Sequence, residues 1–154
     1  MDMEKDQDAQ PIGPVKMGPF FAWRNGRVAR LPNESAFDKA AEWQVTLMRP
    51  LPPGVSDLFL SADYTGDIGR LYLDNALVDD NFFNGQPWQI GLKRFLPEAI
   101  DTHLRIEILP LRKDAPIYLD ATARDRFPHR DQAADLRHLT VTPEYEVVVT
   151  LGKL

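Results

Sequence analysis

The chain has 154 residues, which suits one domain with a substantial core but is too short for a (β/α)8 barrel of roughly 250 residues. The net charge of −5 argues against nucleic acid or an anionic membrane as a partner, because both require a basic binding surface. Without cysteine, the chain forms no disulfide, thiolate zinc site or cysteine nucleophile. We expect no metal and no cofactor.

The N-terminal third predicts a lead-in, a hairpin and a short helix. Residues 1–18 are charged and then proline-rich, which indicates a flexible lead-in or linker before one domain over 19–154. They show no signal peptide, so localisation stays open, and a periplasmic or secreted parent enzyme would carry its signal elsewhere. Asn25-Gly26 favours a type I′ turn in a hairpin over 20–31. Ser35 and Asp38 approximate a capping box, which predicts a helix over 35–42.

From Trp43 onward, apolar residues recur at every second position. This alternation occurs within 43–47, 57–63, 103–108 and 144–151, and it is typical of strands with one face on a core. No helical periodicity longer than about ten residues separates these segments, which argues against βαβ units. The sequence therefore predicts a mostly β, antiparallel jelly-roll β-sandwich with one short N-terminal helix and long loops, among them a polar loop with one helical turn over 121–135.

Two turn signals divide the stretch from residue 57 to residue 83. Thr65-Gly66-Asp67 suits a tight turn, and Asn75 tolerates the left-handed backbone conformation of a second turn. We therefore expect a meander of three strands over 57–63, 68–73 and 76–83.

Residues 63–93 combine aromatic, amide, acidic and basic groups, the chemistry of a sugar site. The candidate ligand-binding residues are Asp63, Tyr64, Asp67, Arg70, Tyr72, Asp74, Asn81, Phe82, Asn84, Trp88 and Lys93. Each also has a structural interpretation: the aromatic residues suit a core, the aspartates suit turns, and Arg70 and Tyr72 suit an exposed sheet face.

Other chemistry has weaker support. Asp79-Asp80 with Asn81 could hold Ca²⁺ but matches no calcium-loop spacing. His103, His129 and His138 fit no metal-binding motif, and no nucleophile elbow occurs. No pair of carboxylates is marked as catalytic, so we assign no catalytic residue.

The strings D-Y-x-G-D-x-x-R-L-Y-x-D and D-N-F-x-N-G-x-P-W lie within residues 57–95. With 108–118 and 141–147, this region resembles the C-terminal β-domain of bacterial family 35 β-galactosidases and related glycoside hydrolases, over roughly residues 36–151. The resemblance implies a galactose-binding-domain-like jelly roll beside a separate catalytic (β/α)8 barrel that carries two glutamates. This chain contains no such barrel.

Three functions follow as hypotheses. The first is a non-catalytic accessory domain that packs against or shapes the barrel, and it predicts an exposed apolar patch on the separated domain. The alternative is a carbohydrate-binding module for glycans that contain β-galactosides. A stand-alone glycosidase is the third, and it lacks a recognisable carboxylate pair.

Overall fold

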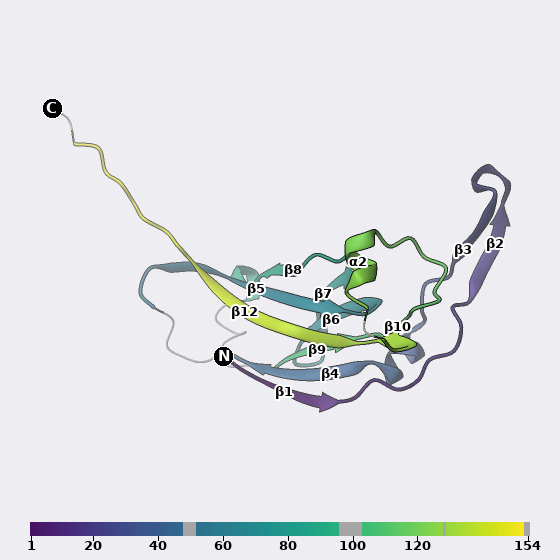
Figure 1. Ribbon diagram of the computed structural model, residues 1–154. Helices are drawn as coiled ribbons and strands as arrows, with labels where there is room; N and C mark the ends of the chain where they lie inside the picture. Colours follow the sequence, from purple (N-terminus) through teal and green to yellow (C-terminus); the bar gives the residue numbers. More distant parts are fainter. Residues whose placement is uncertain (48–51, 96–102, 128, 153–154) are drawn as a thin grey trace.

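The computed structural model describes residues 1–47, 52–95, 103–127 and 129–152, and it is a mostly β, antiparallel sandwich, as predicted (Figure 1). One sheet has the strand order β1-β4-β9-β6-β7. Its strands are β1 (Asp2–Gln7), β4 (Ala41–Thr46), β9 (Leu104–Ile108), β6 (Ile68–Leu73) and β7 (Ala76–Phe82). The second sheet has the order β12-β5-β8, made of β12 (Asp135–Tyr145), β5 (Val55–Thr65) and β8 (Trp88–Gly91).

Smaller elements lie around the sandwich. They are the hairpin of β2 (Met17–Phe21) and β3 (Gly26–Ala29), the pair β10 (Leu111–Arg112) and β11 (Gln132–Ala133), the 3-10 helices η1 (Ala22–Arg24), η2 (Glu34–Lys39) and η3 (Lys93–Phe95), and the helix α2 (Ala121–Asp125). The helical turn expected within 121–135 is thus present as α2, where the Asp120 side chain accepts a hydrogen bond from the Ala123 amide. No helix among the described residues is long and apolar enough to cross a membrane.

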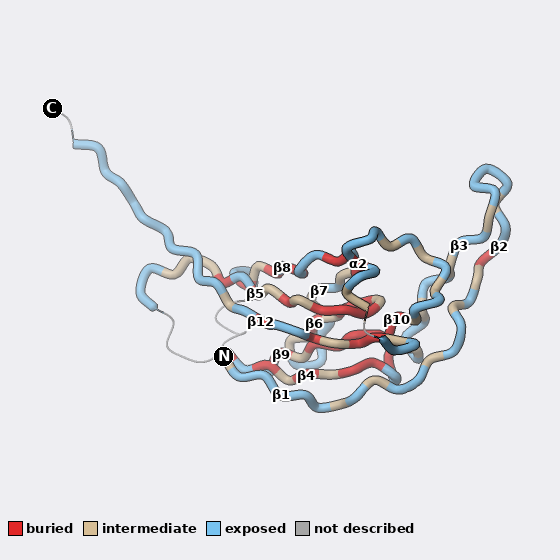
Figure 2. Tube along the Cα trace, in the orientation of Figure 1, coloured by how far each residue is buried: buried red, intermediate tan, exposed pale blue. Residues whose placement is uncertain are grey.

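The core lies between the two sheets (Figure 2). The alternating residues predicted for 43–47, 57–63 and 103–108 supply it, since Val45, Leu60 and Ile106 are almost fully buried. The five-stranded sheet contributes one face and leaves its other face for polar side chains and η2. This one-sided burial is the physical origin of the period-two pattern.

The three strands of the predicted meander form, and β6 and β7 pair as expected, but the predicted pairing of β5 with β6 is wrong. β6 pairs with β7 and β9, whereas β5 pairs with β12 and β8, so the chain crosses between sheets at residues 65–67. Gly66 allows this crossing, because a Cβ there would collide with the Ile108 side chain. In the second turn, Asp74 rather than Asn75 takes the left-handed conformation, with φ of 52°.

The N-terminal elements differ from expectation in three ways. Within the expected lead-in, β1 pairs along β4 as the edge of the five-stranded sheet. The hairpin forms, but η1 and Asn25 make a four-residue connection in place of a type I′ turn. The helix over 35–42 is instead the 3-10 helix η2, whose N-cap, Asn33, makes no capping side-chain bond; β4 begins two residues after η2 ends.

The last strand lies earlier than predicted. β12 begins at Asp135 and runs along β5 to Tyr145, so much of it precedes the predicted strand over 144–151. Residues 146–152 are exposed and belong to no strand. The Glu146 amide donates to the Gly54 oxygen at 3.2 Å, but no strand among the described residues pairs with the rest of this segment.

Candidate functional site

Three of the predicted ligand-binding residues hold the sandwich together. Tyr64 and Trp88 are 0% and 4% exposed, and their rings pack edge-on with centroids 6.2 Å apart. The Tyr64 hydroxyl lies 2.9 Å from both Oδ1 and the backbone oxygen of Asn81, and Trp88 Nε1 donates to Asp79 Oδ2 at 3.3 Å. Neither ring has a free face for a sugar.

A second group of predicted residues shapes turns. Asn84 Oδ1 accepts a hydrogen bond from the Gln86 amide at 2.9 Å, which is a local turn contact. Lys93 is exposed, and its backbone amide donates to Asp57 Oδ1 at 2.7 Å. Asp74, in its left-handed turn, is the third residue of this group. Nine or ten positions separate each of the three residues from the next along the chain, and each contributes to the local backbone structure.

Asp63 precedes the crossing between the sheets, and Asp67 is its last residue. Asp63 forms an ion pair with Arg126, which follows α2. Asp67 is half-buried, and burial raises the pKa of its carboxyl to about 6. Burial also raises the pKa of the Tyr64 hydroxyl well above its ordinary value. These shifts have a structural origin, because both groups lie against the core.

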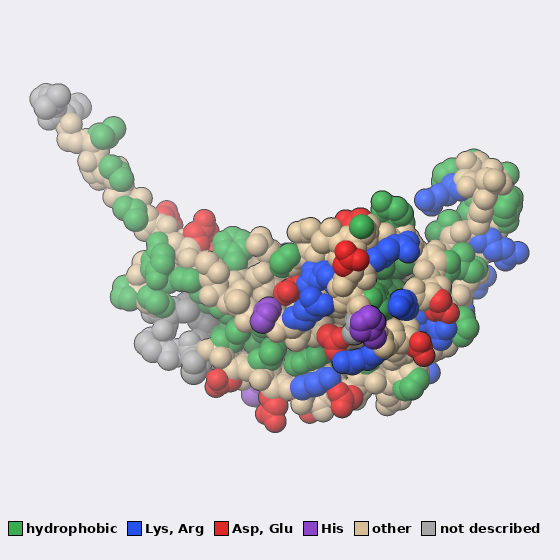
Figure 3. Space-filling view, viewed as in Figure 1, with side chains coloured by type: hydrophobic (Ala, Val, Ile, Leu, Met, Phe, Trp, Pro, Cys, Tyr) green, Lys and Arg blue, Asp and Glu red, His purple; other side chains and the backbone are tan. Residues whose placement is uncertain are grey.

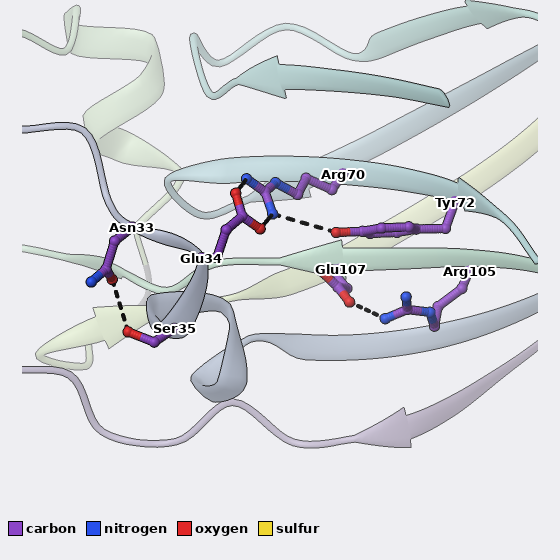
Figure 4. A network of polar contacts seen from close by, with 7 residues as sticks. All are labelled: Asn33, Glu34, Ser35, Arg70, Tyr72, Arg105 and Glu107. Atoms are coloured by element: carbon purple, nitrogen blue, oxygen red, sulfur yellow. Dashed lines mark hydrogen bonds and ion pairs between the residues drawn. The ribbon is translucent and has the colours of Figure 1, made fainter. Parts of the chain in front are cut away.

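Arg70 and Tyr72 face away from the core on the five-stranded sheet (Figure 4). The Arg70 guanidinium makes two hydrogen bonds of 2.8 and 2.9 Å to Glu34 of η2 and lies 3.5 Å from the ring centroid of Phe37. It also donates to the Tyr72 hydroxyl at 3.4 Å. The Glu34 contact raises the pKa of Arg70, and the same contact lowers the pKa of the Glu34 carboxyl.

The neighbouring strand β9 completes this polar cluster. Arg105 lies 4.2 Å over the Tyr72 ring, forms an ion pair with Glu107, and approaches Glu42 of β4 at 3.7 Å. Glu107 is only 6% exposed, and its Oε2 has no hydrogen-bond partner among the described residues. The cluster thus joins three strands and η2, and Arg105 covers one face of the Tyr72 ring.

Phe82 is the predicted aromatic residue that remains accessible. It is 56% exposed on β7, and Leu77 of the same strand is 47% exposed. Asp79 and Asp80, the calcium alternative, are consecutive strand residues and point to opposite faces of the sheet. Among the described residues, no group of three or more His, Asp or Glu side chains could hold a metal ion.

A different surface, outside the predicted stretch, has the largest exposed apolar side chains. The hairpin of β2 and β3 projects from one end of the sandwich (Figure 1). We define the hairpin surface as five side chains that are between 37% and 90% exposed: Phe20, Trp23, Val28, Leu31 and Tyr118. Single exposed apolar residues are common on proteins, whereas several exposed on one projecting element make it a candidate interaction site.

Basic side chains lie beside the hydrophobic ones on the projecting hairpin (Figure 3). Residues 16–31 contain Lys16, Arg24, Arg27 and Arg30 and no acidic residue, in a chain whose net charge is −5. The Arg24 guanidinium lies 5.4 Å over the Trp23 ring. Basic side chains next to aromatic ones favour a partner surface that offers both apolar and acidic side chains.

A shallow cavity of about 290 Å³ lies between the hairpin and residues 116–118. Its lining residues include Arg24, Arg27, Val28, Ile117 and Tyr118. The cavity adds a concave element to the hairpin surface, into which a side chain of a partner could insert. Our sequence reasoning missed this surface, although residues 20–23, Phe-Phe-Ala-Trp, put three aromatic side chains beside a predicted turn.

No family model matches the chain, and comparisons with curated proteins and with solved structures find no significant similarity.

Proposed function

We propose that this chain is a non-catalytic accessory domain that packs against a separate protein domain through the hairpin surface. The observation that carries the proposal is the exposure of Phe20 and Trp23, 57% and 79%, on a projecting hairpin. The accessory-domain hypothesis requires such a patch, whereas a surface of polar side chains alone would have opposed it.

The hairpin itself is poorly supported within the chain. Among the described strands, β2 and β3 pair with each other alone, and two isolated strands are marginally stable in water. A partner that covers Trp23 and Phe20 would bury apolar area and hold the hairpin in place. Tryptophan and arginine are the residue types that most often dominate such interfaces.

The partner we propose is the catalytic (β/α)8 barrel of a β-galactosidase-like glycoside hydrolase. This part of the proposal is supported by the resemblance of residues 57–95 to the C-terminal β-domain of family 35 enzymes. The carbohydrate-binding alternative has less support, because Tyr64 and Trp88 lie in the core and Arg105 covers Tyr72. A stand-alone glycosidase has no observation in its favour.

The test is a binding measurement by calorimetry between the purified chain and the catalytic barrel of a family 35 β-galactosidase. We expect the double variant Phe20→Ser/Trp23→Ser to bind at least about thirtyfold more weakly, because a buried aromatic anchor contributes about 2 kcal/mol or more. The matched control is Leu77→Ser/Phe82→Ser, which removes similarly exposed apolar groups from β7 and should bind normally. Absence of binding by the unmodified chain, or equal weakening by both variants, would refute the proposal.

A further inference from the structure

The segment after β12 has the character of a strand without a partner. Residues 146–152 run out from the sandwich as an extended segment (Figure 1). Val147, Val148, Val149 and Leu151 are each at least 77% exposed, and Figure 3 shows hydrophobic side chains along this segment. Valine-rich segments favour the extended backbone of a strand, and an exposed apolar strand presents unpaired backbone groups to other chains.

The apolar side chains of this segment recur at every second residue, as they do in β12, where Leu139 is buried and Val141 packs against the core. The register against β5 shifts between Glu144 and Tyr145. Beyond that shift, Tyr145, Val147, Val149 and Leu151 share one side of an extended chain. Val147, Val149 and Leu151 are each at least 77% exposed, so this apolar side is uncovered among the described residues.

The segment is complementary to itself when two copies run antiparallel. With Val148 opposite its own copy, Val147 lies opposite Val149 and Tyr145 lies opposite Leu151. Glu146 then lies opposite Thr150, so no like charges meet directly. A strand of arbitrary sequence would not place apolar residues opposite apolar ones when it pairs with itself. This match indicates that the strand which pairs with the segment belongs to a second copy of the chain.

The backbone identifies which edge is free. The Glu146 amide donates to the Gly54 oxygen at 3.2 Å, so it points toward β5. Successive amides of a strand point to opposite edges, and those of Val147 and Val149 therefore point to the edge away from β5. β12 is the outermost strand of its sheet, so no strand among the described residues occupies this edge.

We propose that residues 145–151 pair antiparallel with the same residues of a second copy along this free edge. The contact is isologous, with the two-fold axis at Val148 and backbone hydrogen bonds between Val147 of one copy and Val149 of the other. It joins the two three-stranded sheets and sets four apolar side chains from each copy side by side. This inference does not depend on the proposed function, because it uses the opposite end of the molecule from the hairpin.

The experiment is sedimentation velocity of the full chain over a wide concentration range, with two proline variants. Val149→Pro removes an amide that points to the second copy, whereas Val148→Pro removes an amide that points away from it. We expect a monomer–dimer equilibrium for the unmodified chain, with dimerisation weakened at least about tenfold by Val149→Pro and changed less than about threefold by Val148→Pro. Both positions are exposed and outside the sandwich, so both variants should remain folded.

Three outcomes would overturn the inference. They are a chain that stays monomeric at the highest concentration, equal effects of the two prolines, and a larger effect of Val148→Pro. The variant Trp23→Ser separates this contact from the hairpin surface: it should leave the dimer intact, and loss of the dimer in Trp23→Ser would assign self-association to the hairpin instead. Failure of the barrel-binding test leaves this dimer unaffected.

Discussion

At the scale of single residues, Gly66 and Asp67 form the crossing between the two sheets, where a Cβ at position 66 would collide with Ile108. The Asp67 amide donates to the Leu109 oxygen at 2.8 Å, and its own oxygen accepts from the Phe83 amide at 2.9 Å. These bonds fix the crossing between the sheets and place the Asp67 carboxyl against the core. The pKa of about 6 follows from burial, which disfavours the charged form.

This pKa predicts how stability depends on pH. Because the folded-state pKa of Asp67 is raised from 3.8 to about 6, the folded state binds more protons than the unfolded state between these values. Asp67 therefore lowers stability progressively as pH rises from about 4 to about 6, and the full penalty is present above that range. We expect Asp67→Asn to raise the free energy of unfolding by about 1–3 kcal/mol near pH 7.

Urea unfolding of both proteins at several pH values checks this prediction. The difference between Asp67→Asn and the unmodified chain should shrink toward zero near pH 4, where both side chains are neutral. A difference that is independent of pH would show that the substitution acts through hydrogen bonds or packing. The exposed Asp80→Asn is the matched control and should change stability little at any pH.

At the scale of elements, η2 is held on the sheet by one arginine and a small apolar group. Phe37, Ala40, Ile68 and Leu109 form a second, minor core between η2 and the sheet. Arg70 covers it, because its guanidinium lies over the Phe37 ring and binds Glu34. Arg70, which the sequence placed among the candidate ligand-binding residues, thus attaches this helix to the sheet.

Removal of the guanidinium should loosen η2 without unfolding the sandwich. We expect Arg70→Met, which retains the apolar stem, to destabilise the protein by about 1 kcal/mol and to speed hydrogen exchange in residues 34–40. Glu34→Gln should have a much smaller effect, because the Glu34 side chain is 85% exposed and solvent weakens its ion pair. Exchange that is unchanged in Arg70→Met would show that the minor core alone holds η2.

At the scale of the whole molecule, the two surfaces that could bind a partner lie at opposite ends of the sandwich (Figure 1). The hairpin surface combines exposed aromatic residues with four basic residues, and the segment after β12 is apolar. The stretch 63–93, where we expected a sugar site, lies between them and is largely used for packing, turns and the attachment of η2.

This arrangement predicts little affinity for sugars. We expect isothermal titration of the chain with galactose, lactose or galactan fragments to give no saturable heat at millimolar ligand, because most of the aromatic candidates offer no free ring face. Saturable binding would contradict this and favour the carbohydrate-binding alternative. In that case Phe82→Ala would be the first variant to test, since Phe82 is the accessible aromatic residue of the candidates.

The sequence by itself determined the class of fold and the position of most strands. Period-two alternation predicted the strands that became β4, β5 and β9, and turn residues bounded β6 and β7. These features are local: a residue's neighbours along the chain decide whether its side chain faces the core or water.

Only the tertiary structure decided which strands are neighbours, and therefore what each candidate residue does. Alternation looks the same in either sheet, so it could not show that β5 and β6 separate or that β1 joins β4. The partners of Arg70 and Tyr64 lie 36 and 17 residues away along the chain. Their chemical types placed both side chains among the candidate ligand-binding residues. Contacts between distant segments buried Tyr64 and paired Arg70 with Glu34. The same contacts left the hairpin and the final segment exposed.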